Sequence, residues 1–196
     1  PWQQKIAIIG GGPAGLSCAY FLALQGYKPT VFERNPHPGG MLRYGIPSFK
    51  LEKDVIDAEI KILQELGVEI RCGVDVGRDV TLADLRADGY KAFYVAIGCQ
   101  GGRKAGVPGE DAEGIQTAVT LLRTVGDDEH YKMSGKTVVI GGGNVAIDAA
   151  RVSLRCGADE VTMVCLEPRD GMPASDEEIA EAEAEGTAIR CGYGPK

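Results

Sequence analysis

Residues Lys5–Gly15 read KIAIIGGGPAG and indicate the fold class of this chain of 196 residues. The β-branched run Lys5–Ile9 is typical of a buried parallel strand, and it stops at a glycine turn. Pro13 suits the first turn of a helix, which we expect over residues 14–25, packed on most faces and ended by Gly26. Strand, glycine turn and helix in this order predict a Rossmann-like unit that binds a dinucleotide.

The glycines of this turn have separate tasks. Gly10 allows the tight turn, Gly12 lets a pyrophosphate approach the backbone, and Gly15 lets the helix pack closely on the strand. Glu33 ends the second predicted strand, where a carboxylate can accept hydrogen bonds from ribose hydroxyl groups. A solvated strand end is the alternative interpretation of Glu33. The intact glycine pattern before it favours ribose binding.

A second copy of the pattern lies at residues 137–146, which read TVVIGGGNVA. Gly141 and Gly143 repeat the first two glycines, and Ala146 replaces the third. A glycine turn that serves packing alone is the alternative for either copy. We therefore predict an α/β fold with two Rossmann-like units, an FAD-binding unit over residues 1–125 and a partial NAD(P)-binding unit over residues 126–196.

Glu167 ends the second predicted strand of the later unit and is the counterpart of Glu33. A carboxylate there repels a 2′-phosphate, which favours NAD(H) over NADP(H). Two features oppose this prediction. Arg169 could reach a 2′-phosphate, and Ala146 is a variant often seen with NADP. The choice between the two nucleotides stays open at this point, with NAD(H) favoured.

The charge pattern excludes several classes of partner. The formal net charge is -7, and residues 1–98 hold 11 basic and 11 acidic side chains, so the acidic excess lies in residues 99–196. An acidic chain without basic and aromatic clusters is not expected to bind nucleic acid. Its longest apolar run, around residues 14–24, is too short for membrane insertion, and we find no secretory signal.

The six cysteines form no C-x-x-C pair, and the two histidines stand alone. We therefore expect no metal site, no iron–sulfur site and no dithiol redox centre within the chain. Buried free thiols in a cytoplasmic protein are the simplest interpretation of these cysteines.

Six segments together resemble a known family. IAIIGGGPAGLSCAYFLALQGYKPTVFER, PGGMLRYGIPSFKLEK, FYVAIG, GVPGED, VVIGGGNVAIDAAR and MPAS are similar to the small-subunit family of bacterial glutamate synthase. Its relatives include the flavin module of dihydropyrimidine dehydrogenase and accessory subunits that oxidise NAD(P)H. The resemblance covers essentially the whole chain. It implies a flavoprotein oxidoreductase that transfers hydride from NAD(P)H to FAD, with electrons passed through iron–sulfur clusters to a partner.

The resemblance also implies two sets of binding residues. Those for FAD are Gly10, Gly12, Pro13, Ala14, Gly15, Glu33, Arg34, Gly40, Met41, Leu42, Arg43, Ile46, Val74, Ala96, Ile97 and Gly98. Those for the nicotinamide nucleotide are Gly141, Gly143, Asn144, Val145, Ala146, Glu167 and Arg169. No catalytic acid or base is expected, because hydride transfer is the chemistry of the cofactors themselves.

Two segments of the family are expected outside this chain: a cysteine-rich iron–sulfur segment before it and a returning segment that completes the flavin pocket after it. We therefore expect a module truncated at both ends. A dinucleotide-binding interaction module without turnover is the alternative function. A disulfide reductase resembling thioredoxin reductase is disfavoured by the missing C-x-x-C pair. The terminal electron acceptor is not indicated.

Overall fold

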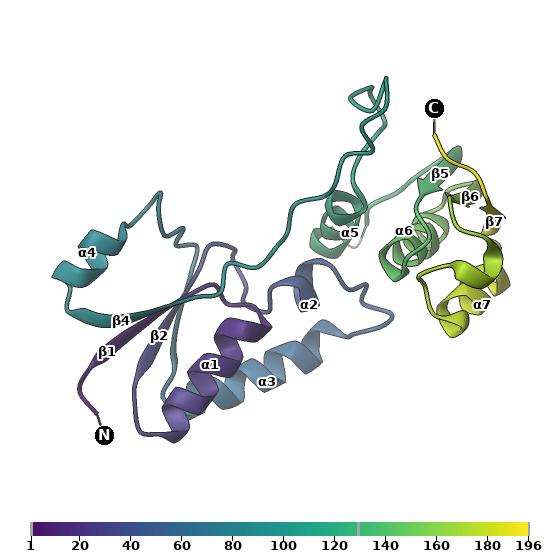
Figure 1. Ribbon diagram of the computed structural model, residues 1–196. Coiled ribbons are helices and arrows are strands. Elements are labelled where there is room, and N and C mark those ends of the chain that lie inside the picture. The colour runs from purple at the N-terminus through teal and green to yellow at the C-terminus, as the bar shows by residue number, and fades with distance from the viewer. Residues whose placement is uncertain (1, 129, 196) are drawn as a thin grey trace. The chain divides into compact units, whose positions relative to one another are not determined.

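The computed structural model describes residues 2–128 and 130–195 and contains two compact units, which divide between Gln100 and Gly101. Both units combine helices with a parallel β-sheet, which confirms the predicted α/β class (Figure 1). The sequence predicts a boundary after residue 125, whereas helix α5 (Ala118–Asp127) packs through Leu122 on helix α6 of the second unit. The connection that follows Gln100 is therefore grouped with the second unit.

The first unit is built on four parallel strands in the order β3-β2-β1-β4. The strands are β1 (Lys5–Ile9), β2 (Pro29–Glu33), β3 (Glu69–Cys72) and β4 (Tyr90–Val95). At the last residue of β1, Ile9 lies opposite Phe32 on one side and Val95 on the other. Because parallel strands share a direction, the turn after β1 lies beside the ends of β2 and β4.

Four helices accompany this sheet: α1 (Pro13–Leu24), α2 (Met41–Tyr44), α3 (Lys53–Glu65) and α4 (Leu82–Ala87). Helices α1 and α3 cover one face, where Ala19 and Leu63 pack on Ile8 and Val31 (Figure 1). The prediction that α1 is packed on most faces is wrong for one side, because Tyr20, Phe21 and Leu24 are exposed.

The second unit has three parallel strands in the order β5-β6-β7. They are β5 (Lys136–Ile140), β6 (Glu160–Cys165) and β7 (Ala188–Cys191), with helices α6 (Asn144–Arg155) and α7 (Asp176–Ala184) and the short 3₁₀-helix η1 (Arg169–Gly171). Ile147 of α6 and Ile179 of α7 pack around Met163 of β6. Both helices therefore lie on the face of the sheet to which Met163 points.

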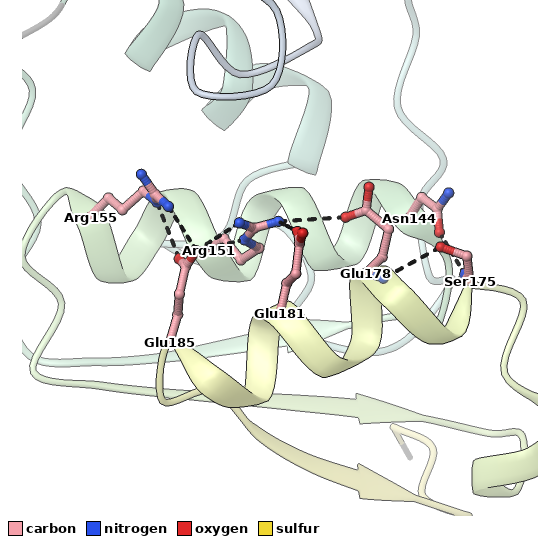
Figure 2. Close-up of polar contacts among 7 residues, drawn as sticks. All are labelled: Asn144, Arg151, Arg155, Ser175, Glu178, Glu181 and Glu185. Carbon is pink, nitrogen blue, oxygen red and sulfur yellow. Dashed lines mark hydrogen bonds and ion pairs between the residues drawn. The ribbon is translucent and has the colours of Figure 1, made fainter.

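An ionic cluster joins α6 to α7 (Figure 2). The side chain of Arg151 on α6 is only 7% exposed, and its guanidinium pairs with Glu178, Glu181 and Glu185 of α7. Arg155 also binds Glu185, with 2.7 Å between Nη2 and Oε1. A buried arginine that lost these carboxylates would be an uncompensated charge, so the cluster ties α7 to α6.

The cluster makes the stability of the second unit depend on pH. Hydrogen bonds from Arg155, and then from Arg151, lower the pKa of Glu185 from 4.5 to about 2. A carboxylate whose pKa is lower in the folded state stabilises the fold above its unfolded pKa, and this contribution is lost as the pH falls through the folded pKa. We expect the free energy of unfolding to fall between about pH 4.5 and about pH 2.

Urea unfolding followed by circular dichroism across this range measures the effect. Glu185→Gln should flatten the pH dependence in this window, whereas Glu177→Gln, at an exposed position on the same helix, should keep the original slope. An equal slope in the unmodified chain and in Glu185→Gln would contradict the assignment.

Candidate dinucleotide-binding sites

A cavity of about 370 Å³ lies at the edge of the first sheet where the parallel strands end. Its volume falls within the range of small-molecule sites, roughly 300–1,000 Å³. The structure brings most of the residues predicted for FAD together in its wall, namely Gly10, Gly12, Pro13, Ala14, Glu33, Arg34, Gly40, Met41, Val74, Ala96, Ile97 and Gly98. These residues come from segments far apart in the sequence, and the parallel sheet gathers them at one edge.

The first glycine turn is tightly packed on one side and open on the other. Gly10 has φ of +109°, and a Cβ there would lie 2.2 Å from the carbonyl oxygen of Ala96. A Cβ on Gly15 would lie 1.9 Å from the carbonyl oxygen of Gly10. At Gly12, however, the only neighbour of a Cβ within 4 Å is the Cα of Gly40, at 3.6 Å. Gly12 thus leaves space on the side of the cavity.

Helix α1 begins at the wall of the cavity. Its N-cap residue is Gly12, which has no side chain to bond the first N–H groups of the helix. Those groups are therefore available to an external acceptor, and the dipole of the helix favours a negative charge there. This arrangement suits a pyrophosphate.

Glu33 is a buried carboxylate fixed against the glycine turn. Its Oε2 atom accepts a hydrogen bond from the Gly11 N–H group at 2.7 Å. Its Oε1 atom accepts from the backbone N–H and the side-chain amide of Asn35, at 2.8 and 2.7 Å. A carboxylate offers about four acceptor positions, so capacity remains for a ribose hydroxyl group. The same contact explains Gly11, because a Cβ there would lie 2.9 Å from Oε2.

Four residues predicted for FAD lie outside the cavity wall: Gly15, Leu42, Arg43 and Ile46. The guanidinium of Arg43 makes two contacts. Its Nε donates to the backbone carbonyl of Pro38 at 2.9 Å, and its Nη2 pairs with Asp57 of α3. The ammonium group of Lys53 on α3 donates to the Ile46 carbonyl at 2.6 Å. Burial, and then the charge of Arg43, lower the pKa of Lys53. These contacts hold the segment around α2 beside the cavity.

Five residues of the cavity wall were not predicted from the sequence: Ile9, Phe32, Asp75, Val76 and Gln100. Ile9 and Phe32 follow from strand order, since they lie opposite each other where β1 and β2 end. Gln100 has a different role, because its Oε1 accepts a hydrogen bond from Arg34 at 3.1 Å. No sequence pattern signals that contact.

The second glycine turn repeats the geometry of the first. Gly141 has φ of +142°, and a Cβ on Gly143 would meet nothing within 4 Å. A Cβ on Gly142 would lie 3.1 Å from Oε2 of Glu167, as a Cβ on Gly11 would lie close to Glu33. Gly143 is the N-cap of α6 and makes no side-chain cap. Both units therefore pair an open glycine and an uncapped helix with a carboxylate beside the turn.

Three of the other residues predicted for the nicotinamide nucleotide, Asn144, Val145 and Ala146, lie at this second turn and the start of α6. Ala146 packs against the glycine turn, since a Cβ on Gly141 would lie 3.3 Å from the Cβ of Ala146. The side chain of Val145 is exposed. Asn144 Oδ1 accepts a hydrogen bond from the Ser175 N–H at 3.0 Å, which joins the start of α6 to the start of α7 (Figure 2). Arg169 donates to Glu183 at 2.6 Å.

Residues 2–128 and 130–195, which the structure describes, contain neither a cluster of possible metal ligands nor a helix that could span a membrane. No three His, Cys, Asp or Glu side chains there are grouped so that they could hold a metal ion. None of the helices in those ranges is both long enough and apolar enough to cross a membrane.

Comparison with known proteins assigns the chain to a family. The model of the pyridine nucleotide-disulphide oxidoreductase family matches residues 4–194. The chain belongs to this family. Pyridine nucleotide-disulphide oxidoreductases use FAD and NAD(P), which agrees with two dinucleotide turns in one chain.

Relatives within the pyridine nucleotide-disulphide oxidoreductases confirm the resemblance to glutamate synthase small subunits and related NAD(P)-dependent oxidoreductase subunits. The beta subunit of NADP(+)-dependent formate dehydrogenase from Moorella thermoacetica is 47% identical, over 93% of this chain and 26% of that protein. The glutamate synthase (NADPH) small chain of Escherichia coli (strain K12) is 39% identical, over 98% of this chain and 43% of that protein.

A solved structure shows the same fold. Mycobacterium tuberculosis FprA in complex with NADPH matches with a TM-score of 0.77 and 25% identity, over 93% of this chain and 48% of that chain. The chain thus spans less than half the length of each of these three proteins.

The contact between Gly11 and Glu33 generates a prediction. Gly11→Ala places a Cβ against Oε2 of Glu33 and displaces the carboxylate from the turn. We expect affinity for FAD to fall by about tenfold or more, which corresponds to a loss of about 1.4 kcal/mol. Fluorescence titration of the apoprotein with FAD measures it. Gly101→Ala is the control, because a Cβ there meets nothing within 4 Å, and it should keep the original affinity. Equal affinities in the two variants would contradict the prediction.

Proposed function

We propose that this chain is an FAD-dependent oxidoreductase module that passes hydride from NADH to FAD for onward electron transfer. The main support is the duplicated arrangement of the two glycine turns, each with an uncapped helix and a carboxylate. One such turn would serve a single nucleotide. Two turns with the same geometry suit a donor and an acceptor that are both dinucleotides.

In this proposal the first cavity holds FAD. The N-terminus of α1 after Gly12 binds the pyrophosphate, and Glu33 accepts a hydrogen bond from the adjoining ribose. The apolar side chains of Ile9 and Val74 offer contacts to the adenine. When bound, the flavin supplies the hydride acceptor, while the protein supplies binding, orientation and electrostatics.

The second turn binds the nicotinamide nucleotide, and we propose that it prefers NAD(H). The names of the formate dehydrogenase and glutamate synthase subunits give NADP(+) and NADPH, so the support for NAD(H) comes from residues of this chain. Glu167 supports it, because its carboxylate lies beside Gly142 at the strand end, where it would repel a 2′-phosphate. Arg169, which could offset that repulsion, is bound to Glu183.

The electrons would leave through a further component. Both curated relatives are named as a subunit or a chain of a larger enzyme, which supports a partner for this chain as well. By resemblance to the glutamate synthase small-subunit family, we propose that the partner or an additional segment carries iron–sulfur clusters. Six free cysteine thiols in the described residues fit a reducing compartment, and we place the protein in the cytoplasm.

An anaerobic titration tests the function. The chain reconstituted with FAD should show the visible absorption of bound flavin and lose it on addition of NADH, faster than with NADPH at the same concentration. Glu167→Gln removes the carboxylate that repels the 2′-phosphate, so it should speed reduction by NADPH by about tenfold while changing reduction by NADH little.

Two outcomes would contradict the proposal. Protein that binds NADH and no FAD would favour the interaction module without turnover. Faster bleaching by NADPH than by NADH in the unmodified chain would overturn the nucleotide preference.

A further inference from the structure

Arg169 occupies a position from which an arginine could serve NADP(H). It follows β6 and lies two residues after Glu167, whose carboxylate lies beside Gly142 of the second glycine turn. An arginine near this strand end can bind a 2′-phosphate through charge-assisted hydrogen bonds. The observed partner of its guanidinium is instead Glu183, with 2.6 Å between Nη2 and Oε2.

Glu183, which binds the guanidinium of Arg169, lies toward the end of α7 that is farther from the glycine turn. Helix α7 begins beside the turn, because the N–H of Ser175, its N-cap residue, donates to Asn144 at the start of α6. Glu183 lies eight residues farther along α7, about 12 Å along the helix axis. Arg169 is therefore paired with a carboxylate near the C-terminal end of α7, whereas the N-terminal end of α7 lies beside the glycine turn.

Glu183 is held in that place by the rest of α7. The buried guanidinium of Arg151 on α6 binds Glu181 and Glu185, the residues that flank Glu183 at a distance of two positions (Figure 2). Ile179 and Ala182 of α7 are buried in the core of the unit. The helix thus presents Glu183 at a fixed position, and its half-exposed carboxylate is accessible to Arg169.

We propose that Glu183 is a specificity-determining residue, which selects against NADP(H) by engaging Arg169, a basic side chain two residues after Glu167 that could bind the 2′-phosphate. Two carboxylates then share the discrimination. Glu167 repels the 2′-phosphate directly, and Glu183 acts through Arg169. This inference rests on the proposed binding of NAD(H) at the second turn.

The dissociation constants of NADH and NADPH, measured by calorimetry on the full chain, test the proposed role of Glu183. We compare the unmodified protein with Glu183→Gln, Arg169→Gln and the double variant. Glu183→Gln should tighten NADPH binding by about fivefold, the factor that corresponds to an exposed ion pair, and should leave NADH binding within about twofold. The gain should vanish in the double variant, because it requires the arginine.

Glu177→Gln is the matched control. It removes the same charge from the first turn of α7, closer to the glycine turn than Glu183. If the loss of a negative charge were sufficient, this control would gain at least as much NADPH affinity as Glu183→Gln, and that result would overturn the inference. Thermal unfolding of each variant verifies that α7 stays folded.

The outcomes separate this inference from the proposed function. An unchanged ratio of NADH to NADPH affinity in Glu183→Gln, with normal NADH binding, overturns the role of Glu183 alone. A gain that persists in the double variant also overturns it. Failure of the unmodified chain to bind either nucleotide overturns the proposed function and this inference together.

Discussion

The fold and the candidate sites depend on a carboxylate that lies against a glycine turn at the end of a parallel strand. In the first unit Glu33 accepts the N–H of Gly11 and two N–H groups of Asn35, so it is buried without losing hydrogen bonds. The backbone can approach the carboxylate this closely only because residue 11 has no Cβ. A carboxylate fixed in this way is positioned before any ligand arrives, which lowers the entropy cost of binding.

A carboxylate beside a glycine turn is also found in the second unit. Here the glutamates of α7 contribute both to the stability of the unit and to the proposed selectivity for NAD(H). The carboxylate of Glu167 also lies close to a glycine turn, since a Cβ on Gly142 would lie 3.1 Å from its Oε2, and here the neighbouring helix α7 adds further charged groups. Its glutamates bind Arg151 and Arg155 on one side and Arg169 on the other. An acidic helix that would be solvated in isolation thus pairs with three arginines of the second unit. The acidic excess of the second half of the chain is in part explained by this arrangement.

The sequence predicted the elements that are determined locally. The two strand-turn-helix patterns at Gly10 and Gly141 can be recognised from the sequence, because close packing and positive φ at these positions require glycine. Residues brought in by strand order were harder to predict, as Ile9 and Phe32 show. Arg43 was predicted for FAD, yet its side chain bonds Pro38 and Asp57. The exposed side of α1 was missed because apolar residues show what can be buried, and the sequence does not reveal which surfaces are covered.

A crystal structure of the chain grown with FAD and NADH tests the central claim most directly. The account predicts a dinucleotide at each glycine turn, with a ribose hydroxyl oxygen within about 3 Å of a carboxylate oxygen of Glu33 in the first unit and of Glu167 in the second. Pyrophosphate density should lie against the first turns of α1 and α6. Dinucleotides bound elsewhere, or turns closed by neighbouring side chains at Gly12 and Gly143, would contradict it.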